Sequence, residues 1–313
     1  MTKLISETGE RGFIEAIRKN FPMALAGDDA AVLETLVTPV VTTDSFTEGT
    51  HFHRWWTTPE AAAERLLEAT LSDLAAMGAD PRYLFSSVIL PPNMELQWML
   101  DFYSGLTGRE GCPVAGGETI RGKTFAITLT AIGDCGKNVP FRRSNAKPGD
   151  SLWVTGPLGR TFNSPELLEK GRRVALSESE RIQTELFLNP RARFDAVQAI
   201  REAGSITAID ISDGLFSECS HIARESGVGI TLDLDRVPLV DYCSERPLDA
   251  CSAGEDYELL FTLPSEKQMT GFYRIGSVTS CGGVETISKG QAISLSEYGY
   301  DHFYKGKRLF SDI

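Results

Sequence analysis

Hydrophobic and polar positions recur with two different periods along the first half of the chain. Apolar side chains three and four positions apart predict amphipathic helices, here at residues 9–20, 59–78 and 94–106. β-branched residues and alternation with period two predict strands, here at residues 37–44, 83–90 and 124–134. The two kinds of element follow one another, which indicates a mixed α/β architecture.

The second half repeats this mixture after a Lys-Pro-Gly-Asp turn at residues 147–150, which leads into the first strand of a new unit. Helices are predicted near residues 178–187, 193–203 and 213–226, and strands at 206–210, 228–234 and 257–263. At roughly 150 residues per domain, a chain of 313 residues predicts two domains. We expect an N-terminal domain at residues 1–141 and a C-terminal α/β domain at 142–313.

The charge of the chain narrows the range of partners. Lys and Arg total 31 against 43 Asp and Glu, a net charge of −12. Binding to nucleic acid or to an anionic membrane needs clustered cations, so neither is expected. The sequence has no apolar run approaching the ~20 residues that span a bilayer, and its N-terminus lacks the apolar core of a signal peptide. We therefore expect a cytoplasmic protein.

Six cysteines are spread along the chain without a C-x-x-C pair or a histidine at zinc-finger spacing. In a long chain of cytosolic composition, we expect buried thiols rather than disulfides, and no zinc.

Residues 117–124 match the P-loop pattern G-x-x-x-x-G-K-[ST]. That motif binds phosphate because a helix begins directly after the loop. Here the following residues, 124–130, are β-branched with period two and predict a strand. We therefore reject a true P-loop.

Carboxylates at the ends of predicted elements are the informative residues. Taken singly, most have a local explanation: Asp28 suits a turn, Asp213 a helix N-cap, and Asp256 the start of a strand. Asp73 is the exception, because it lies in the middle of an apolar helix, where an unpaired charge is costly. Together they suit Mg²⁺, which takes oxygen ligands and shares its shell with phosphates. Several Mg²⁺ ions are most needed where one phosphate attacks another.

Motifs along nearly the whole chain resemble the thiamine-monophosphate kinases, within the aminoimidazole-ribonucleotide-synthetase-like ATP-binding superfamily. The matching blocks are GDDAAV at 27–32, TD at 43–44, EGTHF at 48–52, LSDLAAMGA at 71–79, GGET at 116–119, RS at 143–144, AKPGD at 146–150, IDISDG at 209–214, GEDYEL at 254–259 and GYDHF at 299–303. The set is highly specific, although the ISDG block alone recurs across the superfamily.

The resemblance implies ATP-dependent phosphorylation of thiamine monophosphate to thiamine diphosphate by direct in-line transfer, without a side-chain nucleophile. It implies a homodimer whose N-terminal sheets form a barrel. The residues that it implies for several Mg²⁺ ions are Asp29, Thr42, Thr43, Asp44, Asp73, Glu118, Asp210 and Asp213. Those implied for ATP are Gly117, Glu118, Arg143 and Ser212. Those implied for thiamine monophosphate are His51, Glu255 and an aromatic residue of the tail, Tyr298 or Tyr300.

Taken without the resemblance, Arg143 is equally explained as a solvated cation and His51 as a structural histidine. His53, His221 and His302 are interpreted as structural.

The chain departs from the family pattern at several positions. Glu118 stands where the family has Asp, Arg160-Thr161-Phe162-Asn163 replaces a run of small residues, and the Arg-Pro-x-Pro-Arg block has become residues 188–193.

Two alternatives to the kinase stay open: a nucleotide- and Mg²⁺-binding paralogue with another acceptor or no turnover, and a superfamily enzyme that uses ATP on another acid or amide.

Overall fold

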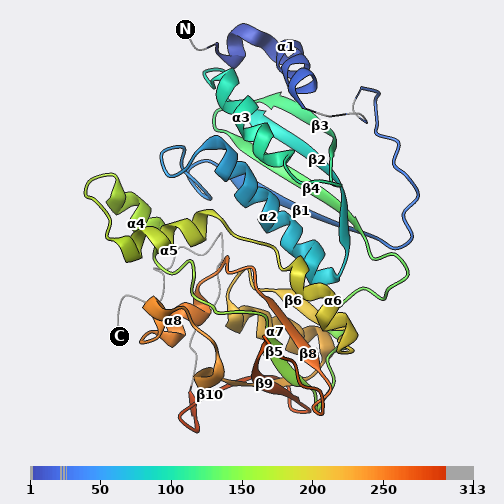
Figure 1. Ribbon diagram of the computed structural model, residues 1–313, viewed down its shortest axis with the longest axis vertical. Coiled ribbons are helices and arrows are strands. Elements are labelled where there is room, and N and C mark those ends of the chain that lie inside the picture. The colour runs from blue at the N-terminus through green and yellow to red at the C-terminus, as the bar shows by residue number, and fades with distance from the viewer. Residues whose placement is uncertain (1–2, 22, 24, 26, 294–313) are drawn as a thin grey trace. The chain divides into compact units, whose positions relative to one another are not determined.

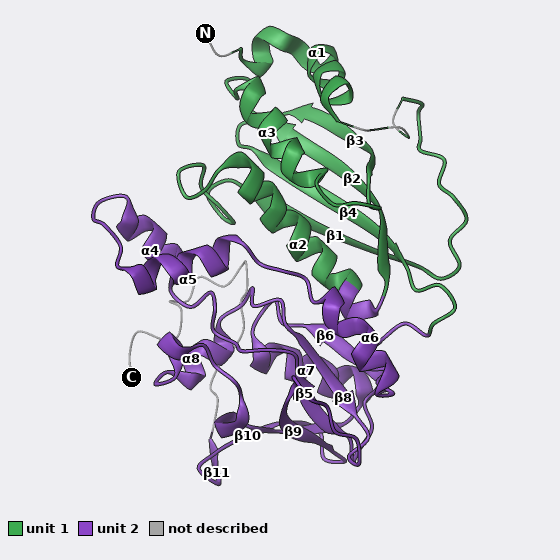
Figure 2. Ribbon diagram, in the orientation of Figure 1, with its two compact units in different colours: residues 1–74, 79–138 green, residues 75–78, 139–313 purple. Residues whose placement is uncertain are grey.

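The first half of the chain folds around a four-stranded sheet (Figure 1). The computed structural model describes residues 3–21, 23, 25 and 27–293. The chain divides into two units (Figure 2): unit 1 comprises residues 1–74 and 79–138, and unit 2 comprises residues 75–78 and 139–313. The expected mixed α/β class is confirmed.

Unit 1 contains three helices and four strands among its described residues. They are α1 (Ile5–Asn20), β1 (Pro39–Thr47), α2 (Pro59–Met77, whose last residues belong to unit 2), β2 (Asp80–Leu90), α3 (Leu96–Leu106), β3 (Val114–Arg121) and β4 (Ala126–Asp134). The strand order is β1-β4-β2-β3, with β4 antiparallel to β1 and β2, and β2 parallel to β3.

The unit 1 sheet has one covered and one open face. Along β4, Ile127, Leu129 and Ala131 are fully buried, while the residues between them are partly exposed. Helices α2 and α3 lie over the covered face (Figure 1), where they contribute buried side chains such as Leu71. On the open face, Val41 is 62% exposed. The period-two alternation of the sequence therefore marks a sheet that this unit covers on one side.

The structure agrees with the rejection of the P-loop. Gly117 lies within β3, and the element that follows residues 117–124 is β4, not a helix. The backbone of Ser86 explains the glycine: a Cβ at Gly117 would lie 2.2 Å from the Ser86 carbonyl oxygen. Gly117 is thus required by close approach between β3 and β2.

Unit 2 is built on a seven-stranded sheet, order β11-β10-β7-β9-β5-β8-β6, in which β10 and β7 are parallel and the other pairs antiparallel. Its helices are η1 (Arg143–Asn145), α4 (Ser164–Gly171), α5 (Glu178–Leu188), α6 (Phe194–Glu202), α7 (Leu215–Ser226), η2 (Leu234–Arg236), η3 (Asp241–Cys243) and α8 (Pro247–Ser252). Its strands are β5 (Ser151–Val154), β6 (Ala208–Asp210), β7 (Gly229–Asp233), β8 (Leu259–Leu263), β9 (Tyr273–Thr279), β10 (Gly283–Ser288) and β11 (Gln291–Ile293).

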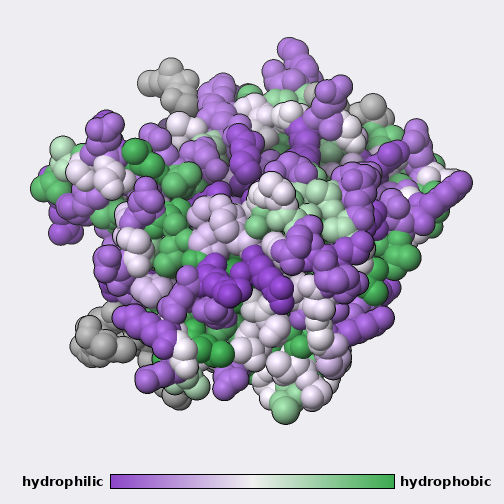
Figure 3. Space-filling view, turned by 60° about the horizontal axis from the view of Figure 1, so that its bottom comes forward, coloured by the Kyte–Doolittle hydropathy of each residue, from purple (hydrophilic) through white to green (hydrophobic). Residues whose placement is uncertain are grey.

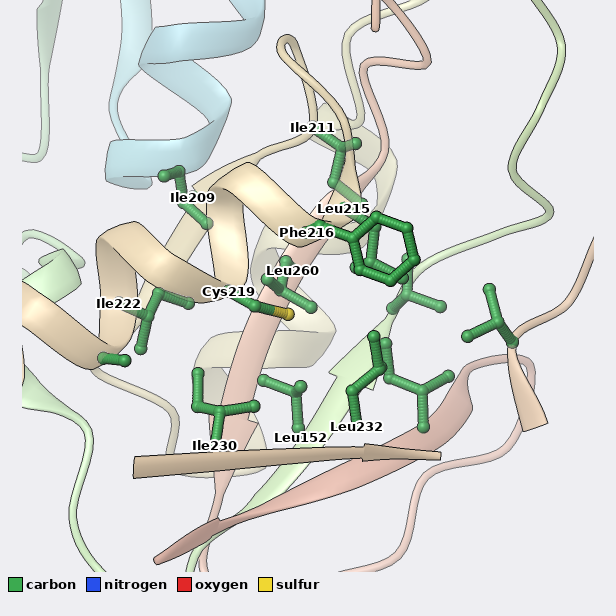
Figure 4. Close-up of a cluster of buried hydrophobic side chains, with 14 of the residues drawn as sticks. Leu152, Ile209, Ile211, Leu215, Phe216, Cys219, Ile222, Ile230, Leu232 and Leu260 are labelled. Carbon is green, nitrogen blue, oxygen red and sulfur yellow. The ribbon is translucent and has the colours of Figure 1, made fainter. Parts of the chain in front are cut away.

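Both faces of the unit 2 sheet are covered. On one face, Leu152 of β5 and Leu260 of β8 pack in a cluster with Phe216 and Cys219 of α7 (Figure 4). On the other face, Trp153 packs in a second cluster that includes residues of α6. All four residues of β5 are buried for this reason, so the strand reads as a continuous apolar run. Each such large side chain contributes about 1.5–3 kcal/mol to stability.

The cysteines largely follow the expectation of buried thiols. Five of the six are buried, and Cys281, just before β10, is exposed. All six are free thiols.

Candidate active site

Two carboxylates meet on the covered face of unit 1. Strand β1 alternates, so Thr42 and Asp44 share the face that α2 covers. The Thr42 hydroxyl donates a hydrogen bond to Oδ2 of Asp73 on α2. The Thr70 hydroxyl, which donates to the Leu66 carbonyl at 2.9 Å, lies close to Asp44. The structure therefore explains the charge in the apolar helix, since Asp73 points to a polar pair on β1.

The electrostatics of this pair favour a bound cation. Burial, together with the nearby charge of Asp73, raises the pKa of Asp44 to about 6, and the nearby Thr70 hydroxyl opposes this rise. Among the described residues, no Lys or Arg forms an ion pair with either carboxylate. A divalent cation would remove the repulsion, so these residues fit Mg²⁺.

Unit 1 supplies only part of a metal shell. Over residues 3–21, 23, 25 and 27–293, no group of three or more His, Cys, Asp or Glu side chains is placed to hold a metal ion. Asp44 and Asp73 are thus two neighbouring carboxylates, with the Thr42 hydroxyl beside them. This suits Mg²⁺, which keeps several waters and takes further ligands from phosphates.

The side chain of Thr43 lies on the other face of β1. Its hydroxyl pairs with that of Thr130, 3.1 Å away on the open face. Thr42 and Thr43 are both among the residues predicted for Mg²⁺, and the structure places their side chains apart, because neighbours on a strand point to opposite faces.

Glu118 also lies on the open face. Its cross-strand partner is Ser87, which in turn faces Thr128 of β4 and, beyond it, Ser45 of β1. Strands β1 and β3 are the two edges of this sheet, so Glu118 and Asp44 are separated by about 14 Å of strand spacing as well as by the sheet itself. Unit 1 does not bring these two predicted ligands together.

Asp29 lies exposed in the loop between α1 and β1. Nothing in the part of the chain that the structure describes joins Asp29 to the Asp44–Asp73 pair.

His51 is held in the loop after β1. Its ring stacks on Phe46, with centroids 5.1 Å apart, and its Nδ1 accepts a 3.1 Å hydrogen bond from the Thr47 backbone. This leaves the proton of the neutral ring on Nε2. Arg65 donates to the His51 carbonyl at 2.6 Å and lies over Phe46. The imidazole is therefore oriented by its own unit.

Three loops of unit 2 leave the sheet at the same end. Asp210, the last residue of β6, pairs with Leu259, the first residue of β8, and Leu259 accepts a 3.1 Å hydrogen bond from Thr155, just after β5. The loop after β5, the segment before β8 and the loop after β6 therefore lie side by side. They carry most of the site residues predicted in the second half.

Backbone hydrogen bonds join two of these segments. The N–H of Glu255 donates to the Ser212 carbonyl at 2.7 Å, and the N–H of Tyr257 to Ile211 at 2.9 Å. Gly254 permits this approach, because a Cβ there would lie 2.4 Å from the Ser212 oxygen. The structure thus brings Ser212 and Glu255 together, next to Asp210 and Asp213.

Arg143 and Asp213 both lie close enough to His221 to affect its charge. Burial, Arg143 and Arg224 lower the pKa of His221, while Asp213 and Glu225 oppose this. The backbone of Arg143 is fixed by Ser226, whose hydroxyl donates to its carbonyl at 2.7 Å. His221 was interpreted as structural, yet it lies close to two predicted site residues.

The sequence did not predict an ionic cluster formed by Asp256 and Glu258, which follow Glu255 in the chain. Glu258 is fully buried and pairs with Arg160 at 2.9 Å and with Arg193. Asp256 accepts backbone hydrogen bonds from Gly159 at 3.0 Å and Arg160 at 2.9 Å. Burial nevertheless raises the pKa of Asp256 to about 7. One feature of the sequence could have indicated this cluster: Arg160 and Arg193 both lie in segments where the chain departs from the family pattern.

Tyr298 and Tyr300, predicted to stack on the substrate, lie outside the described residues.

No helix in the described residues is both long and apolar enough to cross a membrane. On one face of the molecule, hydrophilic side chains alternate with smaller hydrophobic areas (Figure 3).

Comparison with known proteins gives matches along most of the chain. Residues 27–135 match the N-terminal domain of AIR synthase related proteins, and residues 147–289 match the C-terminal domain of the same family. The thiamine-monophosphate kinase of Aquifex aeolicus is 32% identical over 96% of this chain and 99% of the relative. That of Escherichia coli K12 is 34% identical over 88% of this chain and 91% of the relative.

Among solved structures, AaThiL complexed with AMPPCP and TMP matches with a TM-score of 0.77 and 31% identity, covering 97% of this chain and 100% of that one.

Proposed function

Because the chain belongs to the AIR synthase related family and, within it, to the thiamine-monophosphate kinases, we propose that it phosphorylates thiamine monophosphate with ATP. A phosphate oxygen of the acceptor attacks the γ-phosphorus of ATP. The new P–O bond forms as the bond to the β–γ bridging oxygen breaks, which gives thiamine diphosphate and ADP. The observation that carries this proposal is the match to AaThiL, which was solved with an ATP analogue and TMP.

We infer that Mg²⁺ assists this transfer. When bound, it supplies the positive charge that lets two anionic phosphates approach. Asp44 and Asp73 would hold it on unit 1, with the Thr42 hydroxyl keeping Asp73 in position. On unit 2, Asp210 and Asp213 are the residues proposed for further ions. Asp29, Thr43 and Glu118 stay predicted Mg²⁺ ligands. None of them lies beside the Asp44–Asp73 pair in unit 1, so each would need further metal ligands from elsewhere.

The proposed ATP contacts are Gly117, Arg143 and Ser212, with Glu118 nearby. A guanidinium such as that of Arg143 matches a phosphate group in shape and charge. His51 and Glu255 are the proposed contacts to thiamine monophosphate, and both are held in place by hydrogen bonds within their own units. These assignments come from the family pattern, and the fixed positions of His51 and Glu255 support the last two.

We also propose a homodimer in which two unit 1 sheets pack through their open faces. The face exposes Val41 and Ile120 and carries rows of Ser and Thr hydroxyls. A second sheet would cover these side chains and form the expected barrel. Glu118 lies on this face, so a second chain would also give it neighbours that its own unit does not. The cytoplasmic location stays a prediction of the sequence.

The test is product identification with purified protein, ATP and Mg²⁺. Thiamine monophosphate, thiamine and a small set of carboxylic acids and amides are supplied in turn as acceptors. We expect thiamine diphosphate and ADP in equal amounts with thiamine monophosphate, and little ADP with the others. Faster turnover of another acceptor would favour the alternative of a related enzyme with different specificity.

A further inference from the structure

Arg160 is anchored between two buried carboxylates at the end of the unit 2 sheet where Glu255 lies. Its backbone N–H donates to Asp256 at 2.9 Å, and its Nη2 lies 2.9 Å from Oε1 of the fully buried Glu258. The Tyr242 hydroxyl donates to the Arg160 carbonyl at 2.9 Å. The backbone of Arg160 is therefore fixed by two hydrogen bonds, and its guanidinium is tied to Glu258.

The guanidinium of Arg160 keeps donors for a ligand. A guanidinium has five N–H groups, and among the described residues that of Arg160 forms one ion pair, with Glu258. Its side chain is 29% exposed. Arg193 differs, because its Nε and Nη2 bind Asp195 and its Nη1 binds Glu258. Of the two arginines at Glu258, Arg160 is thus the one with N–H groups to offer.

Two other arginines lie near this loop, and both are engaged: Arg193 binds Asp195 and Glu258, and Arg246 lies over Phe162 and pairs with Asp249. The other charged side chains of the adjoining segments are acidic. The carboxylates on the adjoining segments are Asp210, Asp213, Glu255, Asp256 and Glu258. A phosphate group entering this end of the sheet would be repelled unless a cation met it. The planar fork of Arg suits a phosphate better than a point charge would.

We propose that Arg160 binds the phosphate group of the acceptor, thiamine monophosphate. This inference rests on the proposed function. Arg160 is held through Asp256 and Glu258 to the segment that carries Glu255, the predicted acceptor contact, which favours the acceptor over ATP. Arg160 also stands where this chain departs from the small-residue run of its family, so the contact is a feature of this chain's own loop.

The test is a comparison of two Michaelis constants in Arg160→Gln. The KM for thiamine monophosphate at saturating ATP rises about tenfold or more, as expected for loss of a charged hydrogen bond. The KM for ATP at saturating acceptor stays within about twofold, because the lost contact is to the acceptor. Arg236→Gln is the matched control, since Arg236 forms an exposed ion pair with Asp233 and both constants should stay unchanged.

Arg160→Lys provides a second variant if loss of the ion pair to Glu258 prevents Arg160→Gln from folding, as judged by circular dichroism. Lysine keeps the charge and lacks the fork, so the KM for thiamine monophosphate still rises severalfold, and that for ATP does not. An unchanged KM for the acceptor, or an equal rise in both constants, would overturn the inference. A wild-type protein with no turnover of thiamine monophosphate contradicts the proposed function itself, before any variant is compared.

Discussion

The backbone N–H of Glu255 donates a 2.7 Å hydrogen bond to the carbonyl oxygen of Ser212, and this contact joins two segments that lie far apart in the sequence. Each segment alone is a short loop with a local explanation. Joined at the end of one sheet, they place an ATP-contact candidate beside an acceptor-contact candidate. This backbone hydrogen bond therefore helps to position the two candidate contacts for phosphoryl transfer.

Gly254→Ala tests this contact. The new Cβ would lie 2.4 Å from the Ser212 oxygen, so the two segments must separate and the hydrogen bond from Glu255 is lost. We expect turnover to fall at least about tenfold, with a loss of about 1–3 kcal/mol in the free energy of unfolding. Gly282→Ala is the control, because a Cβ there meets nothing within 4 Å. Equal activity in the two variants would show that the contact does not position the site.

Asp44→Asn and Asp73→Asn test the cation site of unit 1. Without divalent cations, Asp44→Asn should be about 1 kcal/mol more stable than wild type near pH 7, since burial and Asp73 oppose the charge of Asp44. With Mg²⁺, the wild type should gain melting temperature while neither variant does. Both variants should lose turnover. Thermal unfolding with and without Mg²⁺ measures both stability effects independently of activity.

Thr42→Ala and Thr43→Ala are a matched pair for the same site. The Thr42 hydroxyl donates to Asp73, whereas that of Thr43 pairs with Thr130 on the other face. Thr42→Ala should raise the Mg²⁺ concentration needed for half-maximal activity more than Thr43→Ala does, because only the Thr42 hydroxyl contacts a carboxylate of the Asp44–Asp73 pair. The reverse ranking would contradict the placement of the cation on the covered face.

Asp256 predicts a pH dependence of stability. Burial raises its pKa to about 7, against an ordinary value of 3.8. Between these values the folded chain keeps a proton that the unfolded chain has released, so this group's contribution to stability falls as the pH rises from about 4 to 7. The change is on the order of 1–4 kcal/mol. Asp256→Asn should remove this slope in urea unfolding measured across the range.

Asp134→Asn is the control, because the pKa of Asp134 is shifted in the opposite direction from that of Asp256. Backbone N–H groups of Val37, Thr38 and Gly136 lower the pKa of Asp134, so its contribution is present above the ordinary value and is lost as the pH falls below it. The Asp134→Asn variant should therefore differ from wild type near neutral pH and approach it in acid. An Asp256→Asn curve parallel to wild type from pH 4 to 7 would rule out the titration of Asp256.

Val41→Glu tests the proposed dimer. Val41 is 62% exposed on the open face, where a second sheet would bury it, so a charge there should shift sedimentation toward the monomer and lower activity. Val174→Glu is the control, because Val174 is 52% exposed between two helices of unit 2. A wild-type protein that sediments as a monomer at micromolar concentration would contradict the proposal.

Elements with strong periodicity were predictable from the sequence. Helix α2 was expected at 59–78 and spans Pro59–Met77, and β4 was expected at 124–134 and spans Ala126–Asp134. Strand β3 was not predicted, because VAGGETIR has two glycines and polar residues, and its pairing with β2 makes it a strand. The short helices α4 and α8 and strands β9 to β11 were missed for a similar reason, since packing outweighs weak local propensity.

The candidate site was predictable in its residue types but not in its arrangement. The charge of Asp73 in an apolar helix correctly signalled a polar partner, which proved to be Thr42 and the neighbouring Asp44. The placement of Thr42 and Thr43 on opposite faces of β1 could have been predicted from the sequence, because side chains alternate along a strand. The placement of Arg160 against Glu258 was not, because it depends on how loops from two strands meet.

The central claim is most directly tested by following the γ-phosphate of ATP. Purified protein is incubated with ATP labelled at the γ-phosphorus, thiamine monophosphate and Mg²⁺, and the products are separated by chromatography. Direct transfer predicts label in thiamine diphosphate, at its terminal phosphate, with one ADP formed for each, and none of either when Mg²⁺ is removed. Label found only in free phosphate, or an absence of thiamine diphosphate while ATP is consumed, would contradict the account.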